Sequence, residues 1–304
     1  MEKKKNDFIA QGSILAIASI LVRVMGMIYR IPMTAIIGDK GNGFYSYAYS
    51  VYTILLLLSS YSLPLAVSKM VSAKAQLGQW RNVKRVFICA IAFAIGIGTT
   101  FGLIVLIGAQ FFTRVFFHSE LAAIALRFMA PTILIMALLG VFRGFFQGLQ
   151  NTLPTAVSQI VEGLINAIMS VVFAYFLFDF GHGMDAAGGT TDLGYAWGAA
   201  GGAIGTGAGA LAGLIFCFIL FVAYRKILAV NISRDKTGTQ QEYGDIFRLM
   251  LSIALPVILS TALYNLIELV DGSLFNNIMA SKGMEDVKDS MWGAYNAKAL
   301  LLVH

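Results

Sequence analysis

The sequence predicts an all-α integral membrane protein. Hydrophobic residues make up 58% of the 304-residue chain and charged residues only 12%, which is far from the composition of soluble domains. Apolar runs long enough to cross a hydrocarbon layer of about 30 Å recur along the chain. In addition, two arginines, Arg23 and Arg30, lie inside the first of these runs.

Seven apolar runs predict membrane-spanning helices, and an eighth begins near Met291. The first run follows a charged N-terminal segment, but it is too long for a signal peptide and lacks a small-residue cleavage site, which predicts an uncleaved helix. The seven spans cover residues 9–36, 44–67, 86–110, 121–146, 155–179, 194–223 and 246–271.

The first span carries a polar stripe. Arg23 and Arg30 are just under two helical turns apart, so both side chains project from nearly the same side. A charge in lipid costs several kcal/mol, and the stripe is therefore predicted to face protein or water. The stripe comprises Gln11, Ser19, Arg23, Gly26, Arg30 and Thr34, and the other faces carry Ile14, Ile17, Leu21, Val24, Ile28 and Ile31.

Lysine and arginine gather in alternate loops, which predicts the orientation of the chain. The N-terminus, the loop after span two and the segment between spans six and seven are rich in these residues and are expected to be cytoplasmic. The net charge of +6 then comes from loops on one side of the membrane. It does not indicate a nucleic-acid partner.

Span five places polar residues at helical spacing: Thr155, Gln159, Glu162, Asn166 and Ser170. A carboxylate such as Glu162 inside the membrane is protonated, paired with an arginine, or part of a proton or cation pathway. Arg23 and Arg30 are the partners expected for a pair.

Span seven repeats this pattern with Thr261, Tyr264, Glu268 and Asp271. Both acids lie near its outer end, where they either extend to the interface or form a cation site.

Two other clusters have ordinary structural explanations. Glycines four residues apart in span six, including Gly205 and Gly209, indicate close helix packing, because a nucleotide-binding fingerprint requires a preceding strand. Aromatic residues near the start of span two indicate an interfacial belt, with sugar stacking as the alternative. These are Phe44, Tyr45, Tyr47, Tyr49 and Tyr52.

Enzyme chemistry is not indicated. The chain has three scattered histidines, and Cys89 and Cys217 both lie in apolar spans. No nucleophile, base and orienting group can be assembled from these residues, and no cysteine spacing suits a metal. We expect no catalytic residue, no metal and no cofactor.

A hydrophilic segment divides the chain into two units. Residues 1–224 form a six-span lobe, 225–245 a cytoplasmic linker, and 246–304 the start of a second lobe. The internal sequence match is weak: a polar-striped span with a proline and an outward loop precede Gly43-Phe44-Tyr45 in one copy and Gly293-Ala294-Tyr295 in the other. Parallel repeats are typical of transporters, with the site between the halves. Because the sequence ends inside an apolar run, we expect a fragment of a longer protein.

Three ordered motifs resemble bacterial polysaccharide flippases, which share a superfamily with the multidrug and toxic compound extrusion transporters. They are RVMG at 23–26, LPLAVSK at 63–69 and RGFFQGLQNTLPTAVSQIVE at 143–162. Within this superfamily, the motifs resemble those of stage V sporulation protein B and the Gram-positive lipid II flippases. The resemblance implies a MATE-like body of about fourteen helices with a cavity that opens alternately to each side. Seven to eight of these helices lie in this sequence.

The resemblance also assigns site residues. Arg23 matches a cavity-facing arginine of lipid II flippases, and Arg30 matches a second arginine more loosely, because the spacing differs by one residue. Leu55 and Leu56 stand where Gram-negative relatives carry an arginine pair. Glu268 or Asp271 matches the helix-seven carboxylate that holds sodium in some relatives.

The predicted function is translocation of a lipid-linked anionic oligosaccharide, such as lipid II, by a monomeric transporter among membrane lipids. Arginine forks suit the pyrophosphate. Alternatives are a cation-coupled multidrug antiporter of the same fold, which would favour carboxylates, and a membrane scaffold for cell-wall or spore-coat synthesis. The expected substrate-binding residues are Arg23, Arg30, Gln147, Gln159, Glu162 and Asn166.

Overall fold

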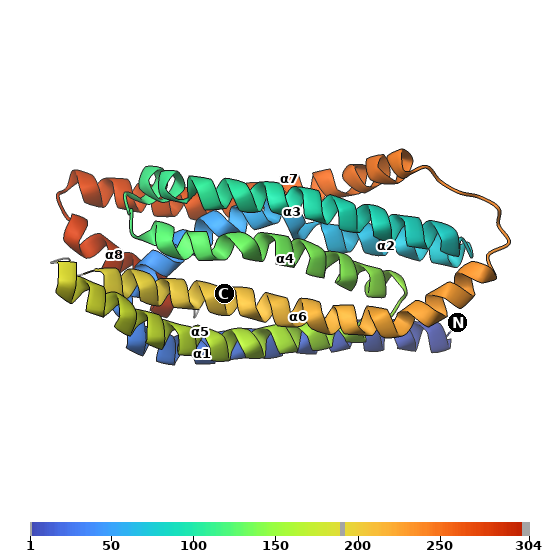
Figure 1. Ribbon diagram of the computed structural model, residues 1–304, viewed down its shortest axis with the longest axis horizontal. Coiled ribbons are helices and arrows are strands. Elements are labelled where there is room, and N and C mark those ends of the chain that lie inside the picture. Colours follow the sequence, from blue (N-terminus) through green and yellow to red (C-terminus); the bar gives the residue numbers. More distant parts are fainter. Residues whose placement is uncertain (1, 189–191, 300–304) are drawn as a thin grey trace.

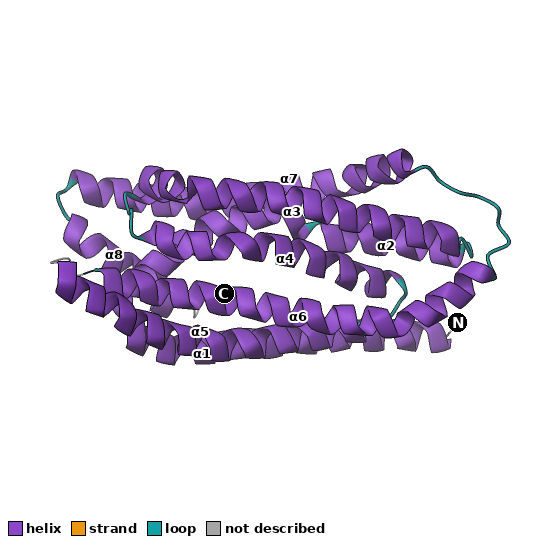
Figure 2. Cartoon of the chain, in the orientation of Figure 1, coloured by secondary structure: helices purple, strands orange, loops and turns teal. Residues whose placement is uncertain are grey.

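A computed structural model describes residues 2–188 and 192–299, which form long helices along one common axis (Figures 1 and 2). Within these ranges the chain contains helices and loops but no strand, so the all-α prediction is confirmed. The elements are α1 Glu2–Leu56, α2 Leu63–Gln76, α3 Trp80–Phe117, α4 Ala122–Gly148, α5 Leu153–Gly188, α6 Leu193–Ser233, α7 Tyr243–Ser281 and α8 Glu285–Ala294, with π-helical turns at Leu57–Tyr61 (η1) and Tyr295–Ala299 (η2).

Six helices in the described part are long and apolar enough to cross a membrane. One of them, Gly12–Gln76, contains the first two predicted spans, and the other five correspond to one predicted span each. The protein is therefore a multi-pass membrane protein. The helices extend beyond the predicted spans: α5, for example, continues to Gly188, because hydropathy marks the apolar part of a helix and not its end.

The break between the first two spans lies at Gly38. Its backbone has φ 63° and ψ −178°, a region that is essentially restricted to glycine. Lys40 Nζ pairs with Asp192 Oδ1 at 2.8 Å, and Asn42 Nδ2 donates to Gly38 O at 3.0 Å. These contacts fix the bend and fasten it to the start of α6.

Replacement of Gly38 by alanine is expected to lower the free energy of unfolding by about 1–3 kcal/mol, the cost of holding a Cβ-bearing residue in this region. Denaturant unfolding in detergent micelles measures the change. Gly26→Ala is the matched control in the same helix, because an added Cβ there meets no atom within 4 Å. Equal stabilities for the two variants would contradict the prediction.

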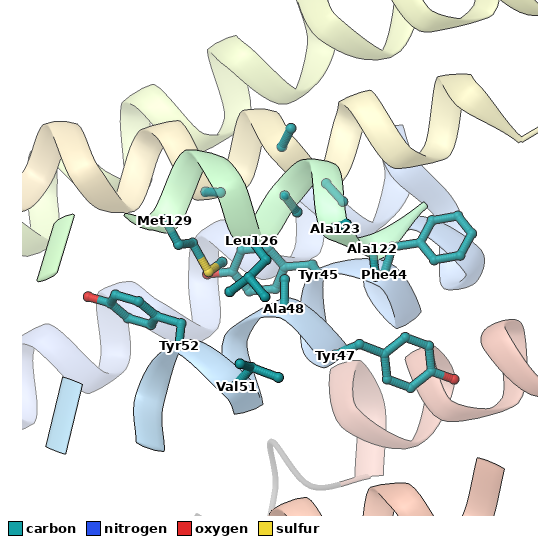
Figure 3. Close-up of a cluster of buried hydrophobic side chains, with 14 of the residues drawn as sticks. Phe44, Tyr45, Tyr47, Ala48, Val51, Tyr52, Ala122, Ala123, Leu126 and Met129 are labelled. Carbon is teal, nitrogen blue, oxygen red and sulfur yellow. The ribbon is translucent and has the colours of Figure 1, made fainter. Parts of the chain in front are cut away.

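The segment after the bend carries its aromatic side chains into the core. Phe44, Tyr45, Tyr47 and Tyr52 are only 2%, 8%, 0% and 3% exposed. Figure 3 shows Phe44, Tyr45 and Tyr52 beside the first turns of α4, whereas Tyr47 points away from α4. The Tyr47 hydroxyl donates to Asn276 Oδ1 of α7 at 2.9 Å. The belt interpretation is wrong for these four residues, because the bend at Gly38 turns this segment toward the bundle. Tyr49, at 39% exposure, is on the surface.

The two ends of the bundle collect different loops. The N-terminus, the 149–152 turn and the connection between α6 and α7 lie at one end, here named the linker end (Figure 1). The turns that follow α3 and α7 lie at the opposite end, named the α8 end. The loops rich in lysine and arginine thus share one end, as the charge pattern predicts.

Glycines of α6 pack directly against the backbone of α5. A Cβ atom at any of three glycines would overlap α5, so the two helices are in direct backbone contact. This confirms the packing explanation for the span-six glycines. The contacting pairs are Gly201 with Ala174, Gly205 with Ser170, and Gly209 with Asn166.

The two halves of the internal match touch each other at the α8 end. A Cβ on Gly43 would overlap the carbonyl of Asp289, and a Cβ on Gly293 would overlap the carbonyl of Asp39. In each copy the aspartate precedes the glycine by four residues. The contact is therefore reciprocal. It is reinforced by Lys298 Nζ, which lies 2.8 Å from Asp39 Oδ2.

Candidate substrate site

Helix α1 has three distinct faces. Val22 and Met25 contact the position of Gly163 on α5. Arg23 and Arg30 project roughly a third of a turn away from that face, since successive residues are about 100° apart. Arg23 is exposed and Arg30 is half-buried. The six predicted aliphatic positions are all exposed, between 37% and 73%, as expected of a lipid-facing surface.

Arg30 contacts the π-helical turn η2. Its Nη1 lies 3.5 Å from the carbonyl oxygen of Asn296. Arg30 therefore points toward the segment that is predicted to begin a second lobe. A site between two lobes would form on this side.

A second group of polar residues joins α4 and α5, and we name it the α4–α5 polar seam: Arg143, Gln147, Thr155, Ser158 and Glu162. Arg143 Nη2 lies 2.6 Å from Glu162 Oε2, and its Nε donates to Ser158 Oγ at 2.8 Å. Gln147 Nε2 donates to Thr155 Oγ1 at 3.3 Å. The Arg143 and Glu162 side chains are 11% and 25% exposed, so this is a mostly buried ion pair.

The expectation that Arg23 or Arg30 neutralises Glu162 is corrected by this pair, because the ion-pair partner in the structure is Arg143. The spacing of these residues about the turn between α4 and α5 could have predicted that Arg143 pairs with Glu162. The turn between α4 and α5 is centred near Asn151, so Gln147 and Thr155, each four residues away, face each other. Arg143, one turn further along α4, then lies opposite the Ser158–Glu162 turn.

The remaining predicted site residues lie in different surroundings. Gln159 Oε1 is buried with no hydrogen-bond partner among the described residues. Asn166 Oδ1 accepts a hydrogen bond from Ser170 Oγ at 2.8 Å, on the side of α5 that packs on α6. Asp271 is exposed on α7. The side chain of Glu268 lies outside those that the structure describes.

Among residues 2–188 and 192–299, no group of three or more histidine, cysteine, aspartate or glutamate side chains is placed to hold a metal ion.

Three tyrosines of α1 lie in a row. The ring centroids of Tyr45 and Tyr49 are 5.8 Å apart, and those of Tyr49 and Tyr52 are 5.9 Å apart.

Two of the three sequence motifs meet in space. Glycines of the RGFFQG motif lie against the LPLAVSK motif of α2: a Cβ on Gly144 would lie 2.6 Å from Pro64 O, and one on Gly148 would lie 2.8 Å from Ser68 O. Arg143 and Gln147 each precede one of these glycines by one residue, about 100° around the helix, and face the seam. These two motifs therefore pack together beside the Arg143–Glu162 pair.

This arrangement has the fold of the MOP superfamily and its MATE-like transporters. A MOP superfamily transporter from Pyrococcus furiosus superposes with a TM-score of 0.61 at 16% identity, covering 93% of this chain and 61% of that one. A MATE transporter in complex with MaD3S gives 0.60 at 15% identity, covering 96% and 62%.

The family is defined more narrowly by sequence. A family model described as polysaccharide biosynthesis protein matches residues 8–303. The chain belongs to this family.

Two curated relatives come from Bacillus subtilis (strain 168). Lipid II flippase MurJ is 25% identical over 289 residues, which are 91% of this chain and 51% of that protein. Stage V sporulation protein B is 26% identical over 266 residues, which are 86% and 48%. The chain thus spans about half the length of these relatives.

Proposed function

We propose that this protein belongs to a transporter that moves a lipid-linked anionic oligosaccharide across the bacterial cytoplasmic membrane by alternating access. The arginine face of α1 carries the proposal, because Arg23 and Arg30 lie in an apolar helix and point away from its α5 contact. A guanidinium inside the membrane is costly unless it serves a ligand or a partner. Phosphate oxygens match its fork of donors.

The proposed division of labour follows the chemistry of the substrate. Arg23 and Arg30 would bind the pyrophosphate, and Gln147 and Gln159 would offer amides to sugar hydroxyls. Asn166 packs against α6 instead. The apolar tail would remain in the lipid beside the exposed aliphatic face of α1. Translocation of this kind needs no covalent step.

Lipid II is the substrate that we propose, since MurJ of B. subtilis is named a lipid II flippase. We place the linker end in the cytoplasm, because lysine and arginine retain loops on that side. Glu268 and Asp271 are proposed to bind the coupling ion, Na⁺ or H⁺.

The α4–α5 polar seam disfavours a cation antiporter. Glu162 is neutralised by Arg143 at 2.6 Å, so this carboxylate does not offer a net negative charge to a cationic drug. The arginines of α1 add positive charge to the same half of the chain. The electrostatic balance of this half suits an anion.

Complementation tests the proposal. The protein as its gene encodes it should rescue a bacterium depleted of its lipid II flippase, and Arg23→Ala or Arg30→Ala should reduce translocation by about tenfold or more. A hydrogen bond to a charged group contributes ~1.5–3 kcal/mol, and about 1.4 kcal/mol is tenfold.

Arg127→Ala is the matched control, because Arg127 is an exposed arginine of α4 outside the arginine face of α1. Full rescue by both α1 variants at normal membrane abundance would overturn the anion site. Failure of the wild-type protein despite normal abundance would exclude lipid II and direct the test to other lipid-linked saccharides.

A further inference from the structure

The connection between α6 and α7 is bound to the start of α3. We name residues 235–243 the strap. Figure 1 shows this stretch crossing the linker end from α6 to the start of α7. Its contacts with α3 involve both side chains and backbone, and each of the first turns of α3 takes part.

The strap begins with a carboxylate that caps α3. Asp235 Oδ2 accepts the Arg81 N–H at 2.9 Å, and Asp235 Oδ1 accepts the Thr237 N–H at 3.0 Å and the Thr237 hydroxyl at 2.6 Å. Arg81 is the second residue of α3, so its N–H is one of the amides that a helix leaves without an internal partner. Asp235 is only 7% exposed.

A buried amide side chain then holds the middle of the strap. Asn82 is 0% exposed. Its Nδ2 donates to Thr239 O at 3.1 Å, and its Oδ1 accepts the Gln241 N–H at 3.0 Å. One side chain thus satisfies both a backbone acceptor and a backbone donor of the strap, and neither bond can form unless the strap is in place.

Arg85 holds the end of the strap where α7 begins. Its Nη1 donates to Gln241 O at 2.5 Å and its Nη2 to Gln240 Oε1 at 2.9 Å. The guanidinium also lies 5.2 Å from the ring centroid of Tyr243, the first residue of α7. These contacts place a cation over an aromatic face, a favourable arrangement.

The contact continues into α7 as apolar packing. Ile246 and Met250 are 1% and 0% exposed and belong to the same buried cluster as Val86 and Ala90 of α3. The start of α7 is therefore attached to α3 along several turns. The predicted division of the chain assigns this part of α7 to the second lobe, whereas its contacts are with the first.

We propose that the strap fastens the start of α7 to α3, so that the two move as one body when the lobes rearrange. The docking itself stands on the contacts above. The movement as one body rests on the proposed function, because it concerns the transport cycle. Residues 235–243 would then have little freedom to move relative to α3.

Hydrogen exchange tests the docking without reference to transport. In Asn82→Ala, the amides of Arg81 and Gln241 are expected to exchange faster than in the wild type. Asp235→Asn is a nearly isosteric second variant that removes one acceptor of the cap. Lys236→Ala is the control in the same segment, because Lys236 is exposed. Unchanged exchange at both amides in Asn82→Ala and in Asp235→Asn would overturn the docking.

The strap is also expected to loosen in acid. Hydrogen bonds from the Arg81 N–H and from Thr237 lower the pKa of Asp235 from 3.8 to about 2, with a smaller contribution from the Arg81 charge. Arg234 and Lys236 flank it in sequence. Because the folded pKa lies below the unfolded one, the stabilisation is complete above pH 3.8 and is lost as the pH falls through about 2. Protection of the Thr237 amide should follow this course, and Asp235→Asn should abolish the step.

Translocation by the protein as its gene encodes it tests the movement as one body. Asn82→Ala is expected to slow translocation several-fold at normal membrane abundance, while Lys236→Ala matches the wild type. A loosened strap with a wild-type rate would overturn this part of the proposal. A wild-type protein that translocates no lipid-linked saccharide would instead contradict the proposed function, and the exchange data would still decide the docking.

Discussion

Replacement of Arg143 by alanine is expected to lower the free energy of unfolding by about 3–5 kcal/mol, because it leaves the Glu162 carboxylate mostly buried without its partner. The cost is larger than that of a surface pair, since the two side chains are only 11% and 25% exposed. Ser158 also loses the donor that binds its hydroxyl. Denaturant unfolding in detergent micelles measures the loss.

The double variant Arg143→Met/Glu162→Gln separates the ion pair from general packing. Removing both charges should recover much of the stability that Arg143→Ala loses, because no unpaired charge remains. Arg127→Ala, in the same helix but exposed, should change stability little. Equal losses for the two single arginine variants would show that the seam carries no coupled pair.

Replacement of Gly205 by alanine is the second substitution with a large expected effect. The added methyl group would overlap both the hydroxyl and the backbone of Ser170. Because backbone cannot move aside as a flexible side chain can, α5 and α6 must separate. Overpacking of this kind costs about 1–3 kcal/mol or more, and unfolding in detergent micelles is again the measurement.

Gly96→Ala is the same kind of substitution, but we expect it not to destabilise the protein. Gly96 lies within α3, and an added Cβ there meets no atom within 4 Å. Alanine should be neutral or stabilising by about 0.5–1 kcal/mol, since it lowers the conformational freedom of the unfolded chain and favours the helix. A Gly205→Ala variant as stable as Gly96→Ala would rule out tight α5–α6 contact.

Much of the fold could be predicted, because the membrane imposes helices and lengths. Hydropathy located the six helices of the described part that are long and apolar enough to cross a membrane. The spacing of the span-six glycines predicted their packing on a neighbour. The prediction that the aromatic residues after Gly38 form an interfacial belt was wrong for a physical reason. Burial of Tyr47 and Tyr52 depends on the direction of the bend at Gly38, and hydropathy contains no information on direction.

The candidate site was predictable only in part. Helical spacing correctly grouped Arg23 with Arg30 on one face, because that geometry is local. The partner of Glu162 depends on how α4 and α5 face each other across their turn, which is a property of two helices. Likewise, the role of Asn82 depends on a segment more than 150 residues further along the chain, and nothing in its local sequence indicates the strap.

The reciprocal contact at the α8 end has the geometry of an isologous interface, in which residue i of one copy meets residue j of the other and j meets i. Gly43 meets Asp289 and Gly293 meets Asp39, with the same spacing in both copies. Two identical molecules that associate about a two-fold axis form contacts of this kind. At the α8 end a single polypeptide therefore makes, between two of its own segments, a pairwise reciprocal contact of the kind found at isologous interfaces.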